Sequence, residues 1–481
     1  MTPKWPHDDG PKILTLVGNN LTIDTRARKT ASSLSRLGFS VVSLGVDSLN
    51  TSIDSENLDG ALLYRIPVSS DSHLFSKTFP LSKPELLDVC RSSMNELRRN
   101  RQRRTELRKS LKNSGPKILV IHIYQKVFIS LNRLCYKALS ISSRLLSRPS
   151  RYFIWHKSWR RVLPELHRYE EKIGRIVELL EPDLIHVHDV FHLGLASRYK
   201  TRLQNKGKET KIVYDVHEFI PGLPVDPQKR HGYEDLESEY VSNVDALVTV
   251  SPGLKSLIKE RFGAEATIVL NSPDLDTTVS ATSVREVIAL PKNQKIVVYV
   301  GGIAAHRGAE TLIEMLQHLE EDIHLVFIAA QPSSGYMEVL KRLASQLGVS
   351  ERVHTAPYVT PEAVIPYISF SDVSVIPLSR EVQNYEVALP NKLFQSLHAK
   401  VPVVVSDNPD MEKFVIETGI GEVFRNNDPV SIATTIRKVL DDPGRYEQAL
   451  TNKNLIHRTS WKVQVSFLTD VYKELGVSLN E

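Results

Sequence analysis

Two stretches of the chain begin with the same pattern, in which a short apolar run ends in glycine and a helical pattern follows. The first run is Lys12–Gly18, and the second starts at Lys295 and ends in Gly301 and Gly302. After each of them, short apolar runs alternate with segments of helical periodicity. Strands that alternate with helices form parallel sheets that are covered by helices on both faces. The sequence therefore predicts an α/β protein with two doubly wound halves.

The length of 481 residues accommodates two such domains. We expect an N-terminal Rossmann-like domain over residues 1–276 and a C-terminal Rossmann-like domain over residues 277–457. A last helix within residues 458–481 is expected to pack back on the N-terminal domain. Open α/β sheets bind ligands at the carboxyl ends of their strands. Two facing sheets would therefore form a central cleft that both of them line.

Positive charge is concentrated in one segment of the chain. Residues 91–168 hold 20 Lys and Arg side chains against three Glu, a balance of +17, whereas the rest of the chain carries −12. Trp155 and Trp159 stand among these basic residues. Basic and aromatic residues interleaved in this way are typical of an interfacial helix on an anionic membrane. We expect an insertion at 91–168 that binds an anionic membrane surface, with a merely solvated basic insertion as the alternative. The admixture of apolar residues disfavours a nucleic acid partner.

The sequence also limits the cellular setting. No apolar run approaches the roughly 20 residues that a membrane span needs. The first ten residues are polar and contain two prolines, unlike a signal peptide. Cys90 and Cys135 are the two cysteines, too few for a disulfide framework or a cysteine metal cluster. The expected location is the cytoplasm, peripheral on the inner face of the membrane.

Four motifs follow one another at strand ends and in loops. They are His186-Val187-His188-Asp189, Tyr214-Asp215-Val216-His217, Gly301-Gly302 with Arg307-Gly308, and Leu389-Pro390-Asn391-Lys392. This ordered set resembles the retaining GT-B glycosyltransferases of glycosyltransferase family 4, also called group 1 glycosyltransferases. The resemblance implies a GT-B fold and transfer of a sugar, with retained configuration, from a nucleoside diphosphate sugar such as a UDP sugar. The implied acceptor is a glycan or a lipid-linked saccharide of cell-envelope polysaccharide biosynthesis.

The chemistry of such a transfer requires positive charge. Breaking the sugar–phosphate bond develops negative charge on the diphosphate, which a metal ion or protein cations must stabilise. Asp274-Leu275-Asp276 has the spacing of a metal-binding pair but follows Pro273, so we expect a turn there, and neither a metal nor another cofactor. Arg307 and Lys392 are instead expected to bind the phosphates. The resemblance places His217 against the donor sugar, which completes the predicted catalytic residues.

Substrate contacts are expected at the same strand ends and helix start. His186 and His188 are expected to face opposite sides of one strand, so that only His188, nearer the strand end, reaches the ligand. Without a third ligand, this pair is not expected to bind zinc. The predicted substrate-binding residues are Gly18, Asn19, His188, Gly301, Gly302, Leu389, Pro390, Asn391 and Gln395.

A few positions depart from the family pattern. The family commonly carries two glutamates eight positions apart, and the corresponding residues here are Val387 and Gln395. Gly302 stands where arginine is frequent. Gln395 would replace a carboxylate that holds the ribose diol. Two alternatives therefore stay open, namely a sugar-nucleotide 2-epimerase of the same fold and a catalytically silent glycosyltransferase-like partner subunit.

Overall fold

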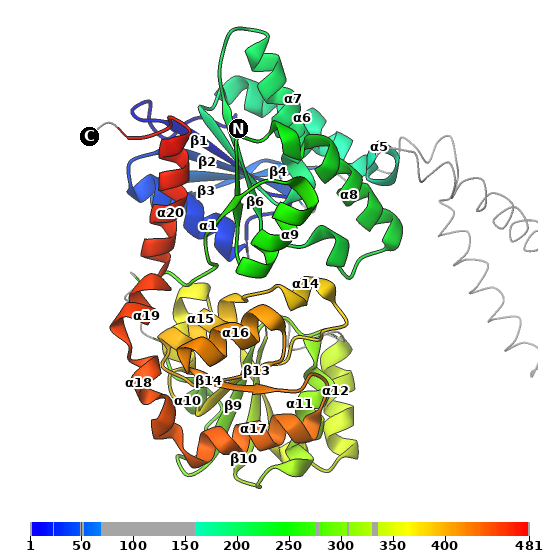
Figure 1. The fold of residues 1–481 in the computed structure, drawn as a ribbon, viewed down its shortest axis with the longest axis vertical. Coiled ribbons are helices and arrows are strands. Elements are labelled where there is room, and N and C mark those ends of the chain that lie inside the picture. Colours follow the sequence, from blue (N-terminus) through cyan, green and yellow to red (C-terminus); the bar gives the residue numbers. More distant parts are fainter. Residues whose placement is uncertain are drawn as a thin grey trace, which may run out of the picture. The chain divides into compact units, whose positions relative to one another are not determined.

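The computed structural model describes residues 2–68 and 159–479, apart from residues 23, 49, 51, 276–278, 280, 305–306 and 330–334. This part of the chain forms two open α/β sheets with their covering helices (Figure 1). Most of the predicted basic insertion, residues 91–158, lies outside the described residues.

The first sheet has eight strands in the order β3-β4-β2-β1-β5-β6-β7-β8. Neighbouring strands are parallel, except that β3 and β4 form an antiparallel pair at one edge. The strands are β1 (Lys12–Leu16), β2 (Ser40–Asp47), β3 (Asp54–Leu58), β4 (Ala61–Pro67), β5 (Leu184–His188), β6 (Lys211–Val216), β7 (Ala246–Thr249) and β8 (Ala266–Ile268).

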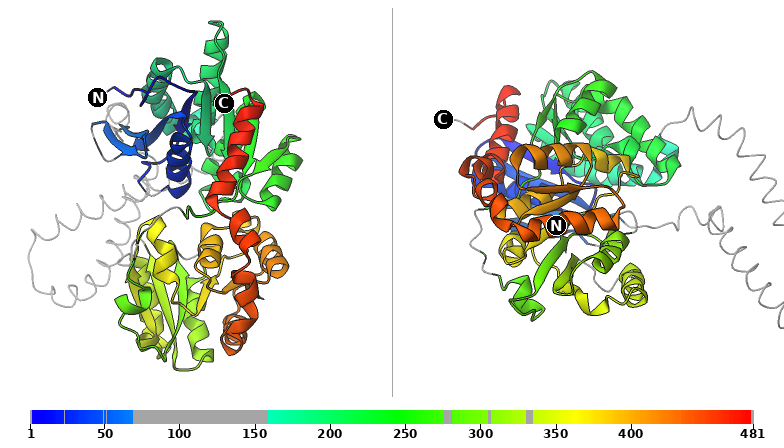
Figure 2. Two further views of the ribbon diagram at one scale, coloured as in Figure 1. Left: turned by 90° about the vertical axis from the view of Figure 1, so that its left-hand side faces the viewer. Right: turned by 60° about the horizontal axis from the view of Figure 1, so that its bottom comes forward.

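Successive side chains of a central strand enter different apolar clusters, which explains why these strands read as continuous apolar runs. Ile13 of β1 packs with α1 on one face, and Leu14 packs with helices on the other face. Both faces are therefore covered (Figure 2). The helices are α1 (Thr25–Arg36), α5 (Trp159–Val162), α6 (Pro164–Leu180), α7 (Leu193–Gln204), α8 (Pro227–Tyr240) and α9 (Pro252–Phe262).

The second sheet has six parallel strands in the order β11-β10-β9-β12-β13-β14. Its strands are β9 (Lys295–Val300), β10 (Ile323–Ala329), β11 (Val353–Pro357), β12 (Val373–Ile376), β13 (Val403–Ser406) and β14 (Gly421–Phe424). Its helices are α10 (Val284–Val287), α11 (Ala309–Glu314), α12 (Gly335–Gln346), α13 (Val364–Ile368), α14 (Gln383–Glu386), α15 (Asn391–His398), α16 (Pro409–Thr418), α17 (Pro429–Asp441), α18 (Glu447–Leu450) and α19 (Lys453–Arg458).

The last helix, α20 (Trp461–Glu474), packs against the first sheet (Figure 1). Its buried side chains Trp461, Leu468 and Tyr472 share one apolar cluster with residues of α1 and β1. The Trp461 indole also donates a hydrogen bond of 2.9 Å to the hydroxyl of Ser33. The C-terminal end of the chain therefore contributes to the core of the N-terminal sheet.

The structure corrects the prediction for the end of the basic insertion, residues 159–168. Trp159 is 1% exposed, and its indole donates to Glu239 at 2.8 Å. Arg160 forms an ion pair with Glu239 at 2.7 Å and lies over the Trp159 ring. A tryptophan beside arginines can lie at a membrane surface, or it can stack on an arginine inside the protein. Trp159 does the latter. This tryptophan is therefore part of the α/β core and cannot contact lipid.

Among the described residues, no helix combines the length and apolar character of a membrane span.

Candidate active site

The carboxyl edge of the first sheet carries a buried charge cluster centred on Asp215, at the end of β6. Arg26 of α1 binds both carboxylate oxygens, with Nε 2.7 Å from Oδ2 and Nη2 2.8 Å from Oδ1. Both side chains are buried. Burial alone would raise the pKa of Asp215, but the charge of Arg26 and the surrounding hydrogen bonds hold that pKa well below its usual value. Asp215 is therefore a permanent anion inside the protein.

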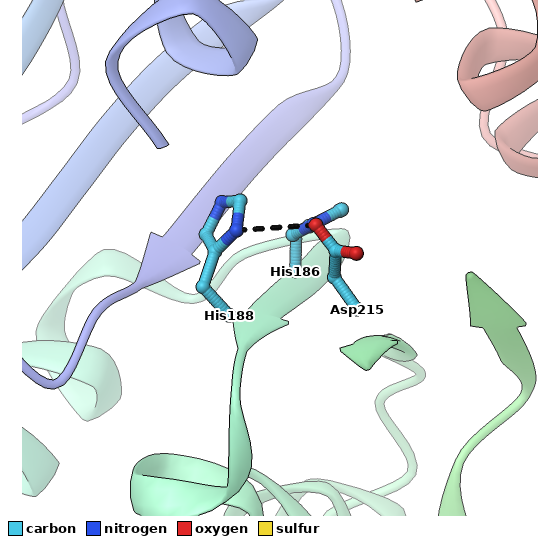
Figure 3. A group of neighbouring side chains, drawn as sticks. All are labelled: His186, His188 and Asp215. Carbon is cyan, nitrogen blue, oxygen red and sulfur yellow. Dashed lines mark hydrogen bonds and ion pairs between the residues drawn. The ribbon is translucent and has the colours of Figure 1, made fainter. Parts of the chain in front are cut away.

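Two histidines of β5 share this carboxylate (Figure 3). His186 Nε2 lies 3.4 Å from Asp215 Oδ2, and His188 Nδ1 lies 3.3 Å from the same oxygen. Their ring centres are 4.4 Å apart. The expectation that these histidines face opposite sides is wrong, because residues two apart on a strand point to the same face. Burial, with the neighbouring His188, lowers the pKa of His186 to about 4, so its imidazole is neutral at physiological pH.

The donor atoms of His186, His188 and Asp215 all lie within 4.8 Å of one another, which supplies the third metal ligand that the sequence did not reveal. The Arg26 guanidinium, however, already occupies both oxygens of the carboxylate. A divalent cation beside that buried guanidinium would meet a like charge at short range. The electrostatics of the cluster therefore disfavour a metal ion at this position.

His217, which follows β6, is paired with Asp189, which follows β5. The His217 Nε2 atom lies 2.8 Å from Asp189 Oδ2, and its Nδ1 atom lies 3.9 Å from Asp215 Oδ2. Asp189 has a φ of 57°, a strained backbone conformation for a residue other than glycine. Burial opposes the charged imidazole, but Asp189 and then Asp215 raise the pKa of His217 to about 9. His217 is therefore an imidazolium at neutral pH.

In the second sheet, the loop after β9 presents Arg307. The Tyr299 hydroxyl donates to the carbonyl of Gly302 at 2.6 Å and so fixes the start of this loop. Gly308 has a φ of 70°, and a Cβ atom there would lie 2.6 Å from the carbonyl oxygen of Pro377, so only glycine fits. The Arg307 guanidinium lies 5.9 Å from the centre of the Tyr385 ring.

Lys392 is the second residue of α15, whose N-cap is Pro390. Its Nζ atom is buried and has no hydrogen-bond partner among the described residues. The same atom lies 5.2 Å from the centre of the Tyr299 ring and 3.3 Å from where a Cβ on Gly301 would stand. Burial and then Arg307 lower the pKa of Lys392 to about 7. An unpaired amine at a helix N-terminus, beside an arginine, is suited to binding an anion.

Several predicted substrate-binding residues have contacts within the protein. A Cβ on Gly18 would lie 2.4 Å from the Phe191 ring, so glycine permits close packing there. The Asn19 amide donates to Asp24, the N-cap of α1, at 2.7 Å. The Asn391 amide donates to Thr25 at 3.2 Å. Leu389 is buried. The ligand contacts of these residues stay predictions.

Gln395 of α15 lines a cavity of about 400 Å³ together with Asn391. Lys29 of α1 also lines it, and its Nζ donates to Asn271 at 2.6 Å. Glu362, from the second half of the chain, lines the cavity as well. Charged and amide side chains therefore form part of the lining of this cavity, which adjoins the first turn of the helix that carries Lys392.

Arg26, Asp189 and Tyr472 belong to the site, although the sequence alone indicated no role in the site for any of them; Asp189 appeared there only as the last residue of a motif. Arg26 precedes Ala27 and Ala31 on the buried side of α1, and an arginine on an apolar helix face could have signalled a buried ion pair. Tyr472 contacts His186 from 286 positions away, for which no local pattern exists.

The comparisons with known proteins agree with this architecture. The family model described as Glycosyl transferases group 1 matches residues 280–455, and the one described as Glycosyltransferase Family 4 matches residues 135–277. A D-inositol 3-phosphate glycosyltransferase of Xylanimonas cellulosilytica is 24% identical over 271 residues, which cover 53% of this chain and 62% of that protein.

A GDP-mannose-dependent alpha-(1-6)-phosphatidylinositol monomannoside mannosyltransferase of Mycolicibacterium smegmatis is 25% identical over 250 residues, which cover 50% of this chain and 64% of that protein. The chain thus spans less than two thirds of the length of both relatives.

Among solved structures, sucrose-phosphate synthase from Thermosynechococcus elongatus superposes with a TM-score of 0.66 at 14% identity, covering 97% of this chain and 99% of that one. This likeness confirms the predicted GT-B fold of two Rossmann-like sheets. The two family models together cover strands β5 to β8 of the first sheet and all six strands of the second sheet. The chain therefore belongs to the group 1, or family 4, glycosyltransferases.

Proposed function

We propose that this protein transfers a sugar from a nucleoside diphosphate sugar to an acceptor and that the anomeric configuration is retained. The observation that carries the proposal is the buried Nζ of Lys392, which has no hydrogen-bond partner in the described part of the chain. A buried amine without a partner is unfavourable unless a ligand completes it. The diphosphate of a sugar nucleotide supplies the required anion.

The chemistry follows from the charges around this position. As the sugar–phosphate bond breaks, negative charge grows on the leaving diphosphate. Lys392, Arg307 and the backbone amides at the start of α15 stabilise that charge, so that the barrier falls. The departing phosphate oxygen then accepts the proton of the attacking hydroxyl, and same-face attack retains the configuration. His217, as a cation, donates a hydrogen bond to the donor sugar.

The proposed acceptor is a glycan or a lipid-linked saccharide. Support comes from the names of the two relatives, one of which acts on inositol 3-phosphate and the other on a phosphatidylinositol mannoside.

Eight basic residues between Arg98 and Lys112 would each contribute about 1 kcal/mol at an anionic membrane surface. Sedimentation with anionic vesicles, for the natural chain and for one with these eight residues changed to Gln, tests this part. Equal binding of both chains would refute it.

The transfer itself is tested by release of UDP or GDP from a panel of UDP- and GDP-sugars, with glycan acceptors present. We expect release from at least one donor, and a loss of at least tenfold in the Lys392→Met variant. The anomeric configuration of the product, measured by NMR, tests retention.

The catalytically silent partner subunit is the second candidate, favoured by Gln395 in place of a carboxylate. Tight nucleotide binding without turnover of any donor in the same panel would favour that candidate over the transferase.

A further inference from the structure

The C-terminal helix reaches into the charge cluster of the first sheet. Tyr472 of α20 is fully buried, and its hydroxyl oxygen lies 2.7 Å from Nδ1 of His186. The other ring nitrogen of His186 faces Asp215. His186 therefore connects the end of the chain with the carboxylate that organises the site.

The position of the His186 proton follows from these two contacts. Asp215 accepts hydrogen bonds only, so the ring nitrogen that faces it, Nε2, carries the hydrogen. Nδ1 is then proton-free and accepts the hydrogen bond that the Tyr472 hydroxyl donates. Burial keeps the Tyr472 hydroxyl protonated, because it raises the pKa of Tyr472 well above its usual value.

The same reasoning assigns the proton of His188. Its Nδ1 faces Asp215 Oδ2 at 3.3 Å and therefore carries the hydrogen when the ring is neutral. Its Nε2 is then proton-free. Both ring nitrogens of His188 are buried, and neither makes a hydrogen bond within the part of the chain that the structure describes, so the 3.3 Å approach of Nδ1 to Asp215 is a charge contact only. His188 is the last residue of β5, and its ring centre lies 6.1 Å from that of His217. A hydroxyl group is the natural partner of a proton-free imidazole nitrogen at this edge.

We propose that Tyr472 is a positioning residue, which acts through His186 and Asp215 to hold Nε2 of His188 ready to accept a hydrogen bond from a hydroxyl group of the glycan acceptor. This proposal rests on the proposed function. Without the Tyr472 hydroxyl, Nδ1 of His186 would be buried and unpaired. The His186 ring could regain a hydrogen-bond partner for Nδ1 only by rotating. That rotation would move the Nε2 hydrogen of His186 away from Asp215 Oδ2, the oxygen that His188 also contacts.

The test compares Tyr472→Phe with Tyr446→Phe. Tyr446 is a matched control, because it is also buried and its hydroxyl donates to Glu422 at 2.8 Å, in the second half of the chain. In Tyr472→Phe we expect an acceptor KM about tenfold higher, which is the size of effect that one lost hydrogen bond produces. The Kd for UDP or GDP is expected to stay unchanged. Tyr446→Phe is expected to leave the acceptor KM unchanged.

Nitrogen-15 NMR of the imidazoles gives a readout that does not need activity. In the natural chain we expect His186 protonated at Nε2 and His188 at Nδ1, and in Tyr472→Phe a changed pattern for His186. A natural chain with His186 protonated at Nδ1 would overturn the proposal, as would equal acceptor KM values in the two variants. If no donor is turned over at all, the proposed function fails. The NMR pattern still decides whether Tyr472 sets the proton positions of His186.

Discussion

The amine nitrogen of Lys392 lies 5.2 Å from the centre of the Tyr299 ring, where it is buried and has no hydrogen-bond partner among the described residues. The contact joins β9, which contains Tyr299, to the start of α15. An aromatic face stabilises a cation only in part. The arrangement therefore resembles a binding site kept at the expense of stability.

Replacing Lys392 with Met should stabilise the protein without ligand. An apolar side chain of similar length fills the same space and removes a buried, unpaired amine. We expect the free energy of unfolding to rise by about 1 kcal/mol or more, measured by urea denaturation. Lys413→Met, at an exposed lysine, is the control and should change little. A Lys392→Met protein less stable than the natural chain would show that the amine has a stabilising partner.

The His217–Asp189 ion pair should make stability depend on pH. The folded-state pKa of His217 is about 9, above its ordinary value of 6.5, so the pair stabilises fully below pH 6.5 and loses its effect as the pH rises through 9. In Asp189→Asn, burial should dominate and bring the His217 pKa below 6.5. NMR titration of His217 measures this change. A pKa that stays near 9 in Asp189→Asn would assign the effect to Asp215 instead.

Asp215→Asn should be the most destabilising single substitution in the charge cluster. It leaves the Arg26 guanidinium buried without its counter-charge, a loss of about 3–5 kcal/mol. Glu178→Gln breaks the exposed pair with Arg202 and should change stability by less than about 1 kcal/mol. Thermal or urea unfolding distinguishes the two. Similar small effects in both variants would mean that Asp215 is hydrated in solution.

Much of this fold was predictable from the sequence, because strands buried on both faces appear as short apolar runs. The apolar runs Lys211–Val216, Lys295–Val300 and Val373–Ile376, for example, coincide with β6, β9 and β12. By contrast, α8 (Pro227–Tyr240) was missed, because most of its residues are polar and few are buried. Strand β14 was missed as well, since three of its four residues are only partly buried and the strand lacks an apolar pattern.

The candidate site was predicted less completely than the fold. Motifs located His188, His217, Arg307 and Lys392 at strand ends and a helix start, because those places are set by the local alternation of strands and helices. The partners of these residues come from distant parts of the chain. Asp215 binds Arg26 from 189 positions away, and only the three-dimensional structure brings the two together.

Gln395→Glu should strengthen nucleotide binding. The resemblance to family 4 enzymes implies a carboxylate that holds the ribose diol at this position, and a charged acceptor forms stronger hydrogen bonds than an amide. We expect a Kd for UDP or GDP about tenfold lower, measured by calorimetric titration. Unchanged or weaker binding would mean that the ribose does not contact residue 395.

The central claim is that Lys392 and Arg307 bind the diphosphate of the donor. The most direct measurement is calorimetric titration of UDP and GDP at pH 7 into the natural chain, Lys392→Met and Arg307→Met. We predict binding of at least one nucleotide by the natural chain and a Kd at least tenfold higher in each variant, because each removes a charged contact to phosphate. Binding of equal strength in all three proteins would contradict the claim.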